Sequence, residues 1–115
     1  MALPANFRIK GKDNFQKVKE NGKVFQFGLF GLSSLSRKDK EVTRFAFIVS
    51  TKISKKAVQR NRIKRLLADS VKVLLTKIKK GYDIIFLAKR RIIEVGKDEV
   101  NSEVKKALEK IDLFR

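Results

Sequence analysis

Residues 52 to 65 read K-I-S-K-K-A-V-Q-R-N-R-I-K-R, which places seven Lys or Arg in fourteen positions without one carboxylate. No Asp or Glu occurs anywhere between Val42 and Ala68. Hydrophobic residues then recur at three- and four-residue steps, which predicts a helix with one buried face. The basic run therefore opens a helix, although a helix N-terminus is itself partly positive and attracts acids. A one-sign cluster at this unfavourable position favours a polyanion-binding site over an ordinary solvated face.

The helix start has the residue types that bind phosphate groups. On a helical wheel, Arg62 and Arg65 fall opposite the hydrophobic stripe, while Arg60 and Lys64 lie on its flanks. We therefore expect the first turn to project from the sheet or to border a groove. Guanidinium forks suit phosphate oxygens, and Asn61 can hydrogen-bond a sugar or a base edge. The full candidate site comprises Lys52, Lys55, Lys56, Arg60, Asn61, Arg62, Lys64 and Arg65.

Composition limits the possible functions. The 115 residues have a net charge of +17; residues 1–80 hold 21 Lys and Arg against 5 Asp and Glu, whereas residues 81–115 hold 8 against 7. One part of the molecule is therefore expected to face a polyanion. The chain has no Cys and no His, which excludes a disulfide framework, a thiolate metal site and a two-histidine ribonuclease mechanism. Its carboxylates are dispersed, so we expect neither a catalytic residue nor a metal site in the protein.

The pattern of hydrophobic residues indicates one compact domain. No uninterrupted apolar run exceeds five residues, which is too short for a membrane span or a secretory signal. The length suits a single modest core. We expect one cytoplasmic RNA-binding domain over residues 1–115, without membrane contact.

An arm and a short helix are expected first. Residues 1–12 show little periodicity and predict an extended arm from which Phe7 and Ile9 touch the core. The sequence D-N-F-Q-K-V-K-E-N at residues 13–21 predicts a helix of about two turns with Asp13 as its N-cap. A helix this short depends on tertiary packing.

Two strands are expected next. Residues 23–32 alternate as a strand, although Gly28 and Gly31 weaken it or signal a bulge or a close approach. Residues 33–41 read as a polar turn. Residues 43–50 predict a second strand whose unbroken apolar centre suggests burial on both faces. A hairpin is the natural connection between the two strands.

The remaining elements alternate between helix and strand. A linker at residues 52–57 leads into a long helix at residues 58–79, with Lys79 and Lys80 at its C-terminus. A buried strand follows at residues 82–89, and a mixed-charge helix at residues 97–111 closes the chain. This order predicts an α+β fold.

Aromatic residues divide into core and candidate binding positions. The chain has nine Phe, and most are expected in the core because strand-spaced Phe usually pack inward. Phe15 is the exception that we predict to be partly exposed, beside a basic helix face formed by Lys12 and Lys19. There it can stack on a single-stranded base. Asp69 is expected to pair along the helix with Arg62 or Arg65.

Taken together, these residues resemble the protein component of bacterial ribonuclease P. The resemblance rests on Arg44 at the start of a strand and on K-K-A-V-Q-R-N-R-I-K-R-L-L at residues 55–67. It extends to L-P at 3–4, R-I-K at 8–10, N-F-Q-K-V at 14–18 and G-Y-D-I-I at 81–85, and so covers nearly the whole chain. The order A-V-x-R-N-R-x-K-R at a helix start is highly specific in this context.

The resemblance implies a fold and a binding arrangement. The fold is a small α/β sandwich with a mixed, mainly antiparallel sheet and a left-handed βαβ crossover, an exception to the usual hand. The family's basic motif faces the catalytic RNA, and a cleft between the first helix and the sheet holds the 5′ leader of precursor tRNA. Phe15 matches the aromatic position of that cleft. Lys19 stands where a second aromatic is common, which implies a more electrostatic leader contact.

The resemblance also implies a division of chemical labour. In this family the RNA hydrolyses the phosphodiester with Mg²⁺ that it binds itself, so the protein is an accessory subunit of an endoribonuclease and holds no stable cofactor. It binds the RNA one to one and assists 5′ maturation of tRNA. A ribosomal or RNA-chaperone protein with the same charge and architecture is the alternative, and reconstitution with ribonuclease P RNA distinguishes the two.

Overall fold

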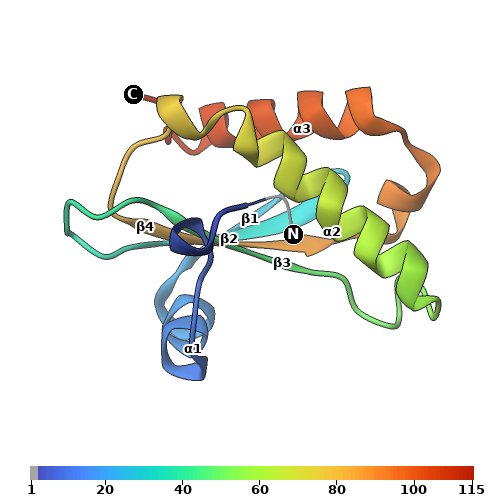
Figure 1. The fold of residues 1–115 in the computed structure, drawn as a ribbon, viewed down its shortest axis with the longest axis horizontal. Helices are drawn as coiled ribbons and strands as arrows, with labels where there is room; N and C mark the ends of the chain where they lie inside the picture. The colour runs from blue at the N-terminus through green and yellow to red at the C-terminus, as the bar shows by residue number, and fades with distance from the viewer. Residues whose placement is uncertain (1–2) are drawn as a thin grey trace.

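The computed structural model describes residues 3–115 as three α-helices packed on a four-stranded sheet (Figure 1). The helices are α1 (Lys12–Asn21), α2 (Ala57–Lys72) and α3 (Lys97–Lys110). The strands are β1 (Lys23–Gln26), β2 (Phe30–Ser36), β3 (Arg44–Ile48) and β4 (Tyr82–Ala88). Short 3₁₀ turns lie at η1 (Ala5–Phe7), η2 (Leu75–Lys77) and η3 (Arg90–Glu94). The predicted α+β class is confirmed, and within residues 3–115 no helix is long and apolar enough to cross a membrane.

The strand order is β1-β2-β4-β3, with β3 and β4 parallel and the other pairs antiparallel. The predicted hairpin between the two N-terminal strands is therefore wrong, because β4 lies between β2 and β3. The apolar centre of β4, from Ile84 to Phe86, is buried on both sides. Such a strand gains most from an interior position, which leaves β3 at the sheet edge. The crossover β3-α2-β4 is parallel, and its left hand stays a prediction.

The segment predicted as one strand over residues 23–32 contains a hairpin. Phe27 N donates to Phe30 O at 3.0 Å between β1 and β2, and β2 continues to Ser36 through residues that were predicted as a turn. Because β2 lies between β1 and β4, its backbone groups find partners on both sides, which outweighs the modest strand preference of Ser. Ser33 is buried on the sheet face that α1 covers.

The sheet separates a large core from a small one. Figure 1 shows α2 and α3 on one face of the sheet and α1 on the other. The α2 side holds the main core, in which the stacked rings of Phe47 and Phe86 lie 5.4 Å apart between centroids. Eight of the nine Phe lie in this core or pack against it, as the sequence predicted for most of them. The α1 side buries Val18 and Ile85 outside that core.

The two faces of β3 differ in burial. Phe45 and Phe47 are buried toward α2, whereas Ala46 and Ile48 on the opposite face are only half-buried. Leu87 of β4, the register partner of Ile48, is 38% exposed. The prediction that residues 43–50 are buried on both faces is wrong, because α1 packs mainly on β2 and β4 and leaves the edge strand uncovered. This uncovered face is an apolar strip open to solvent.

Helix α2 ends at Lys72, seven residues before the predicted end of the helix. The following segment turns through η2 and then pairs with the C-terminal segment: Lys79 N donates to Leu113 O at 2.7 Å and Arg115 N donates to Lys77 O at 2.8 Å. These inter-segment bonds compete with helical bonds and remove the segment from α2. The prediction that Lys79 and Lys80 lie at the C-terminus of the long helix is therefore wrong.

The N-terminal segment differs in detail from the prediction. Phe7 packs against the core as expected, but Ile9 lines a pocket beside α1 instead. Helix α1 starts after Gly11, whose φ of 85° is accessible mainly to glycine, and no side chain caps it. Asp13 lies in the first turn, where its charge suits the helix dipole, so its prediction as the cap is wrong. The first two residues of the expected arm lie outside the described residues.

Candidate nucleic-acid interface

The start of α2 is positive and uncapped. Lys56 occupies the N-cap position, no side chain caps the helix, and the first turn holds no acid. The partial positive charge of the helix terminus therefore adds to the charges of the nearby side chains. In Figure 1 this end of α2 extends beyond the end of the sheet, as the all-round basic first turn predicted. Such an arrangement attracts anions.

The turn before α2 is organised by Ser54. Its hydroxyl donates to Gln59 Oε1 at 2.5 Å and accepts from Lys56 N at 3.2 Å. Its carbonyl accepts a hydrogen bond from Arg60 Nη1 at 3.0 Å. Arg60 is consequently half-buried and oriented along the turn, with other N–H groups left for a ligand.

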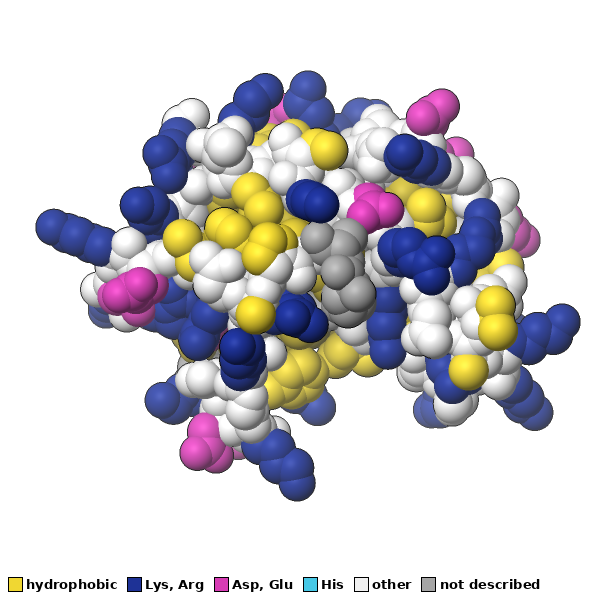
Figure 2. Space-filling view, in the orientation of Figure 1, with side chains coloured by type: hydrophobic (Ala, Val, Ile, Leu, Met, Phe, Trp, Pro, Cys, Tyr) yellow, Lys and Arg dark blue, Asp and Glu magenta, His cyan; other side chains and the backbone are white. Residues whose placement is uncertain are grey.

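The wheel positions of the basic motif agree with the sequence prediction. Arg62 and Arg65 are exposed and Lys64 is half-buried, while Ile63 between them is 1% exposed and faces the core. The predicted pairing of Asp69 is wrong, since within residues 3–115 it forms no ion pair with either Arg. Figure 2 shows Lys and Arg side chains around the end of the molecule where α2 begins. The exposed members of the motif are Lys52, Lys55, Lys56, Asn61, Arg62 and Arg65.

One cation that the sequence analysis did not identify, Arg90, lies beside this site. Arg90 Nη2 donates to Lys52 O at 3.1 Å, which joins η3 to the turn before α2. Arg91, the next residue of η3, instead pairs with Glu99 of α3, with 3.6 Å between Nη2 and Oε2. The triplet K-R-R at residues 89–91 could have indicated the Arg90 contact from the sequence. Because β3 and β4 are parallel, the segments that follow the two strands leave from the same end of the sheet.

Helix α1 contributes a separate pocket on the other face of the sheet. The pocket has a volume of about 610 Å³, and Lys12 and Phe15 are among its lining residues. Phe15 is half-buried and is the one Phe of the nine that lies outside the main core, as predicted. Lys19 Nζ lies 5.9 Å from the centroid of the Phe15 ring, within cation–π range. The three residues predicted for a leader cleft are therefore neighbours.

The pocket and the open strip of β3 share one side of the sheet. Ala46, Ile48 and Leu87 point toward the α1 side by strand alternation and register. In Figure 2, hydrophobic atoms are visible below the sheet, between the protruding α1 and the end where α2 begins. This side therefore offers an aromatic ring, an apolar strip and nearby cations, the combination found in sites for single-stranded nucleic acid.

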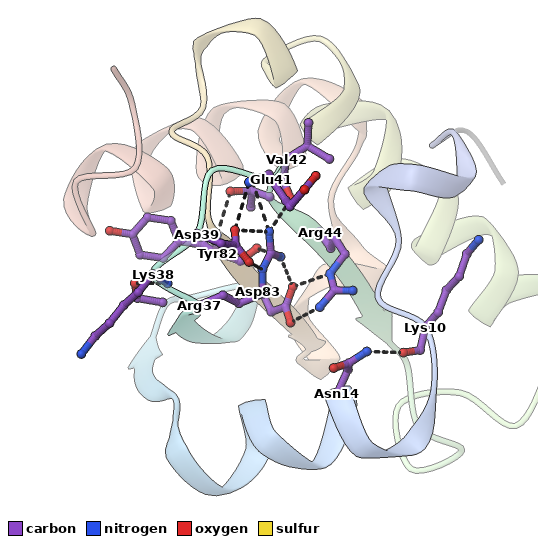
Figure 3. Close-up of polar contacts among 12 residues, drawn as sticks. Lys10, Asn14, Arg37, Lys38, Asp39, Glu41, Val42, Arg44, Tyr82 and Asp83 are labelled. Carbon is purple, nitrogen blue, oxygen red and sulfur yellow. Dashed lines mark hydrogen bonds and ion pairs between the residues drawn. The ribbon is translucent and has the colours of Figure 1, made fainter.

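A buried ion-pair network lies at the other end of β3 (Figure 3). Asp83 is 2% exposed and accepts from Arg44 Nε at 2.8 Å and from Arg44 Nη2 at 2.7 Å. It also accepts from Arg37 Nη1 at 2.5 Å. The register that sets Arg44 opposite Asp83 brings these residues together, and the sequence analysis did not predict it because it requires the β3–β4 pairing.

Arg37 connects this network to the loop between β2 and β3. Its guanidinium donates to both carboxylate oxygens of Asp39 and to the carbonyls of Glu41, Val42 and Tyr82. Burial alone would lower the pKa of Arg37, but Asp39 and Asp83 outweigh this effect and raise it above its ordinary value. The hydrogen bond from Arg37 in turn lowers the pKa of Asp39. The hydrogen bonds of the Arg37 guanidinium therefore hold the loop in place.

Comparison with known proteins agrees with this geometry. The Ribonuclease P family model matches residues 3–112. The ribonuclease P protein component of Caldanaerobacter subterraneus is 33% identical, covering 93% of this chain and 90% of the relative. That of Clostridium kluyveri is 34% identical, covering 95% of this chain and 97% of the relative.

A solved structure extends the likeness to the fold. The Staphylococcus aureus RNase P protein has a TM-score of 0.85 to this chain at 26% identity, covering 95% of this chain and 98% of that one. The family model, the relatives and the fold all lead to one assignment, which the basic motif at the start of α2 had already suggested. This chain belongs to the family of ribonuclease P protein components.

Proposed function

We propose that this chain binds the RNA of ribonuclease P through the start of α2 and assists the cleavage of precursor tRNA. The observation that carries the proposal is the lack of carboxylate partners for the cations of the basic motif. None of the seven Lys and Arg between Lys52 and Arg65 forms an ion pair with any residue of the described chain. Their charges are therefore free to neutralise phosphates, which supplies most of the affinity of basic proteins for RNA.

The pocket beside α1 and the open strip of β3, which together we call the leader groove, are proposed to hold the single-stranded 5′ leader. Phe15 supplies a stacking face, a contact worth about 1–3 kcal/mol per base. Lys19 lies over that ring, and a cation–π contact at an exposed site is worth only about 0.5–1 kcal/mol. A leader base therefore displaces the Lys19 ammonium, which remains close enough to contact the next phosphate. Lys12 on the pocket rim adds a second cation.

The chemical step is assigned to the RNA. The family resemblance gives the RNA the Mg²⁺ ions that hydrolyse the phosphodiester, and within residues 3–115 no cluster of three or more Asp and Glu offers a comparable ion site. The protein acts by neutralising phosphates and holding the leader, one copy to one RNA, in the cytoplasm.

Reconstitution tests this function directly. The purified chain is added to the RNA of a bacterial ribonuclease P, and cleavage of precursor tRNA is measured across a Mg²⁺ titration. The expected result is stimulation of cleavage at low Mg²⁺, because Lys and Arg side chains of the bound protein then neutralise phosphates that Mg²⁺ does not. At high Mg²⁺ the protein should have little effect. Lack of stimulation at every Mg²⁺ concentration rejects the proposal.

A further inference from the structure

A second pocket lies at the start of β3, away from the basic start of α2. It has a volume of about 440 Å³ and is lined by Asn6, Arg37, Asp39, Glu41, Val42 and Arg44. Arg44 is on the same face of β3 as Ala46 and Ile48, the open strip of the proposed leader groove. At about 3.3 Å per residue, Arg44 lies about 13 Å along the strand from Ile48. The pocket is therefore at the outer end of that groove.

Some polar groups of the pocket are bonded within the protein, and others remain available to a ligand. Arg37 commits its N–H groups to the loop and to Asp83. Arg44 commits Nε and one Nη2 hydrogen to Asp83, so three of the five N–H groups of an arginine remain free. Among the described residues, the side chains of Asn6 and Glu41 have no hydrogen-bond partner. The pocket thus offers a fixed set of donors beside a free carboxylate.

The charge of the pocket differs from that of the α2 start. Two guanidinium groups, those of Arg37 and Arg44, and two carboxylates, those of Asp39 and Glu41, line the pocket, so the charges of its lining cancel. The lining therefore offers a phosphate no excess positive charge, in contrast to the carboxylate-free start of α2. The favoured ligand is uncharged and carries hydrogen-bond acceptors for Arg44 next to donors for Glu41. A nucleobase has this character.

We propose that this pocket reads a guanine in the upstream part of the precursor tRNA leader, an inference that rests on the proposed function. Guanine presents O6 and N7, two acceptors that suit the fork of an arginine. Its N1–H and N2 amino group form an adjacent donor edge that suits a carboxylate. Single-stranded bases are open to such reading on both edges. Arg44 binds the acceptor edge, Glu41 binds the donor edge, and buried Asp83 is a positioning residue that fixes the plane of Arg44.

The test moves one guanine along a leader that otherwise lacks guanine and measures precursor tRNA affinity of the reconstituted enzyme at fixed salt. One upstream position should bind on the order of fivefold more tightly with guanine than with adenine, the size expected for one base contact. Inosine, which lacks the amino group, and 7-deazaguanine, which lacks N7, should each lose part of the gain. Equal affinity at every position overturns the inference.

Variants assign the preference to the pocket. Glu41→Ala should abolish the guanine preference without affecting folding, since its side chain makes no internal bond. Glu109→Ala is the matched control on α3, because it removes one exposed carboxylate from the opposite face and should leave the preference intact. Arg44→Lys keeps the charge but loses the guanidinium fork, so it should also abolish the guanine preference. Adding Asp83→Asn to the Arg44→Lys variant should then change the guanine preference no further.

The outcomes separate this inference from the proposed function. A wild-type enzyme that is stimulated by the protein but shows no guanine preference leaves the function standing and overturns the guanine pocket. A preference that survives Arg44→Lys or Glu41→Ala overturns the pocket as well. A protein that stimulates no cleavage at all overturns both.

Discussion

The arginines of this protein serve two opposite purposes in two regions. At the start of α2, Arg62 and Arg65 are exposed and have no carboxylate partner within residues 3–115. At the start of β3, Arg37 and Arg44 share the buried carboxylate of Asp83. The first pair is free for an external polyanion, whereas the second pair has an internal counter-charge in Asp83.

This difference shows that residue type alone does not identify an RNA contact. A guanidinium contributes to phosphate binding only where its donors and its charge are not already used internally. In this chain, the available cations lie in the stretch from residue 52 to 65, which holds no carboxylate, whereas Arg37 and Arg44 share one buried carboxylate, that of Asp83. Each prediction below tests one side of this contrast.

The largest effect is expected from the buried side. Asp83→Asn should reduce the free energy of unfolding by about 3 kcal/mol, because it leaves the partly buried guanidinium of Arg44 without a carboxylate partner and removes one of the two carboxylates that pair with Arg37. Urea unfolding followed by circular dichroism measures this loss. Arg62→Ala, at the α2 start, is the control and should change stability by less than about 0.5 kcal/mol. Equal losses in the two variants would erase the distinction between the regions.

The exposed side should respond in RNA binding. Arg65→Ala should weaken binding and lower the slope of log affinity against log salt by about 0.7–0.9, the value for one lost phosphate contact. Arg60→Ala should lower the slope equally and also cost about 1 kcal/mol of stability, because it loses its bond to Ser54 O. Filter binding to ribonuclease P RNA over a salt series measures both slopes. Unchanged slopes in both variants would mean that these residues do not meet phosphate.

A smaller effect is expected at Lys19, whose ammonium lies over the ring of Phe15. Lys19→Phe should strengthen leader binding at high salt by about 1 kcal/mol, because base stacking is less sensitive to salt than a phosphate contact. Affinities for precursor tRNAs with and without a leader provide the measurement. Affinity that does not depend on the leader in either protein would argue against the groove beside α1.

The smallest effect concerns the pH dependence of the Arg37–Asp39 pair. The folded-state pKa of Asp39 is lowered, so its contribution to stability is fully present above the ordinary Asp pKa and is lost as pH falls through the lowered value. The difference in unfolding free energy between wild type and Asp39→Asn should therefore shrink toward zero on acidification. Urea unfolding at a series of acidic pH values measures this difference. A difference that grows on acidification would contradict the assigned pairing.

Local sequence patterns predicted the elements whose partners are nearby. The helix at residues 97–111 and the strand at residues 82–89 each agree with the structure to within one residue. The orientation of Arg62 and Ile63 on α2 was also predicted, because helix periodicity fixes which side chains face inward. Phe15 was singled out because it shares a short helix with two Lys, and it lies outside the core.

The sequence did not predict the features that depend on contacts between distant segments. The hairpin inside residues 23–32 and the position of β4 between β2 and β3 both result from strand pairing, which local propensity does not encode. The early end of α2 depends on bonds from residues 77–79 to the C-terminal segment. Arg90 joins the basic site only because β3 and β4 are parallel.

By itself, the sequence predicted a polyanion-binding site and the basic residues that form it, because charge and helix periodicity are local properties. Its residue order also named the family. Only the tertiary structure decided that the edge strand β3 leaves an apolar strip open, and that Arg37 and Arg44 pair with the buried carboxylate of Asp83. The physical reason is that burial and ion pairing depend on which strands become neighbours, and in this chain those neighbours are far apart in sequence.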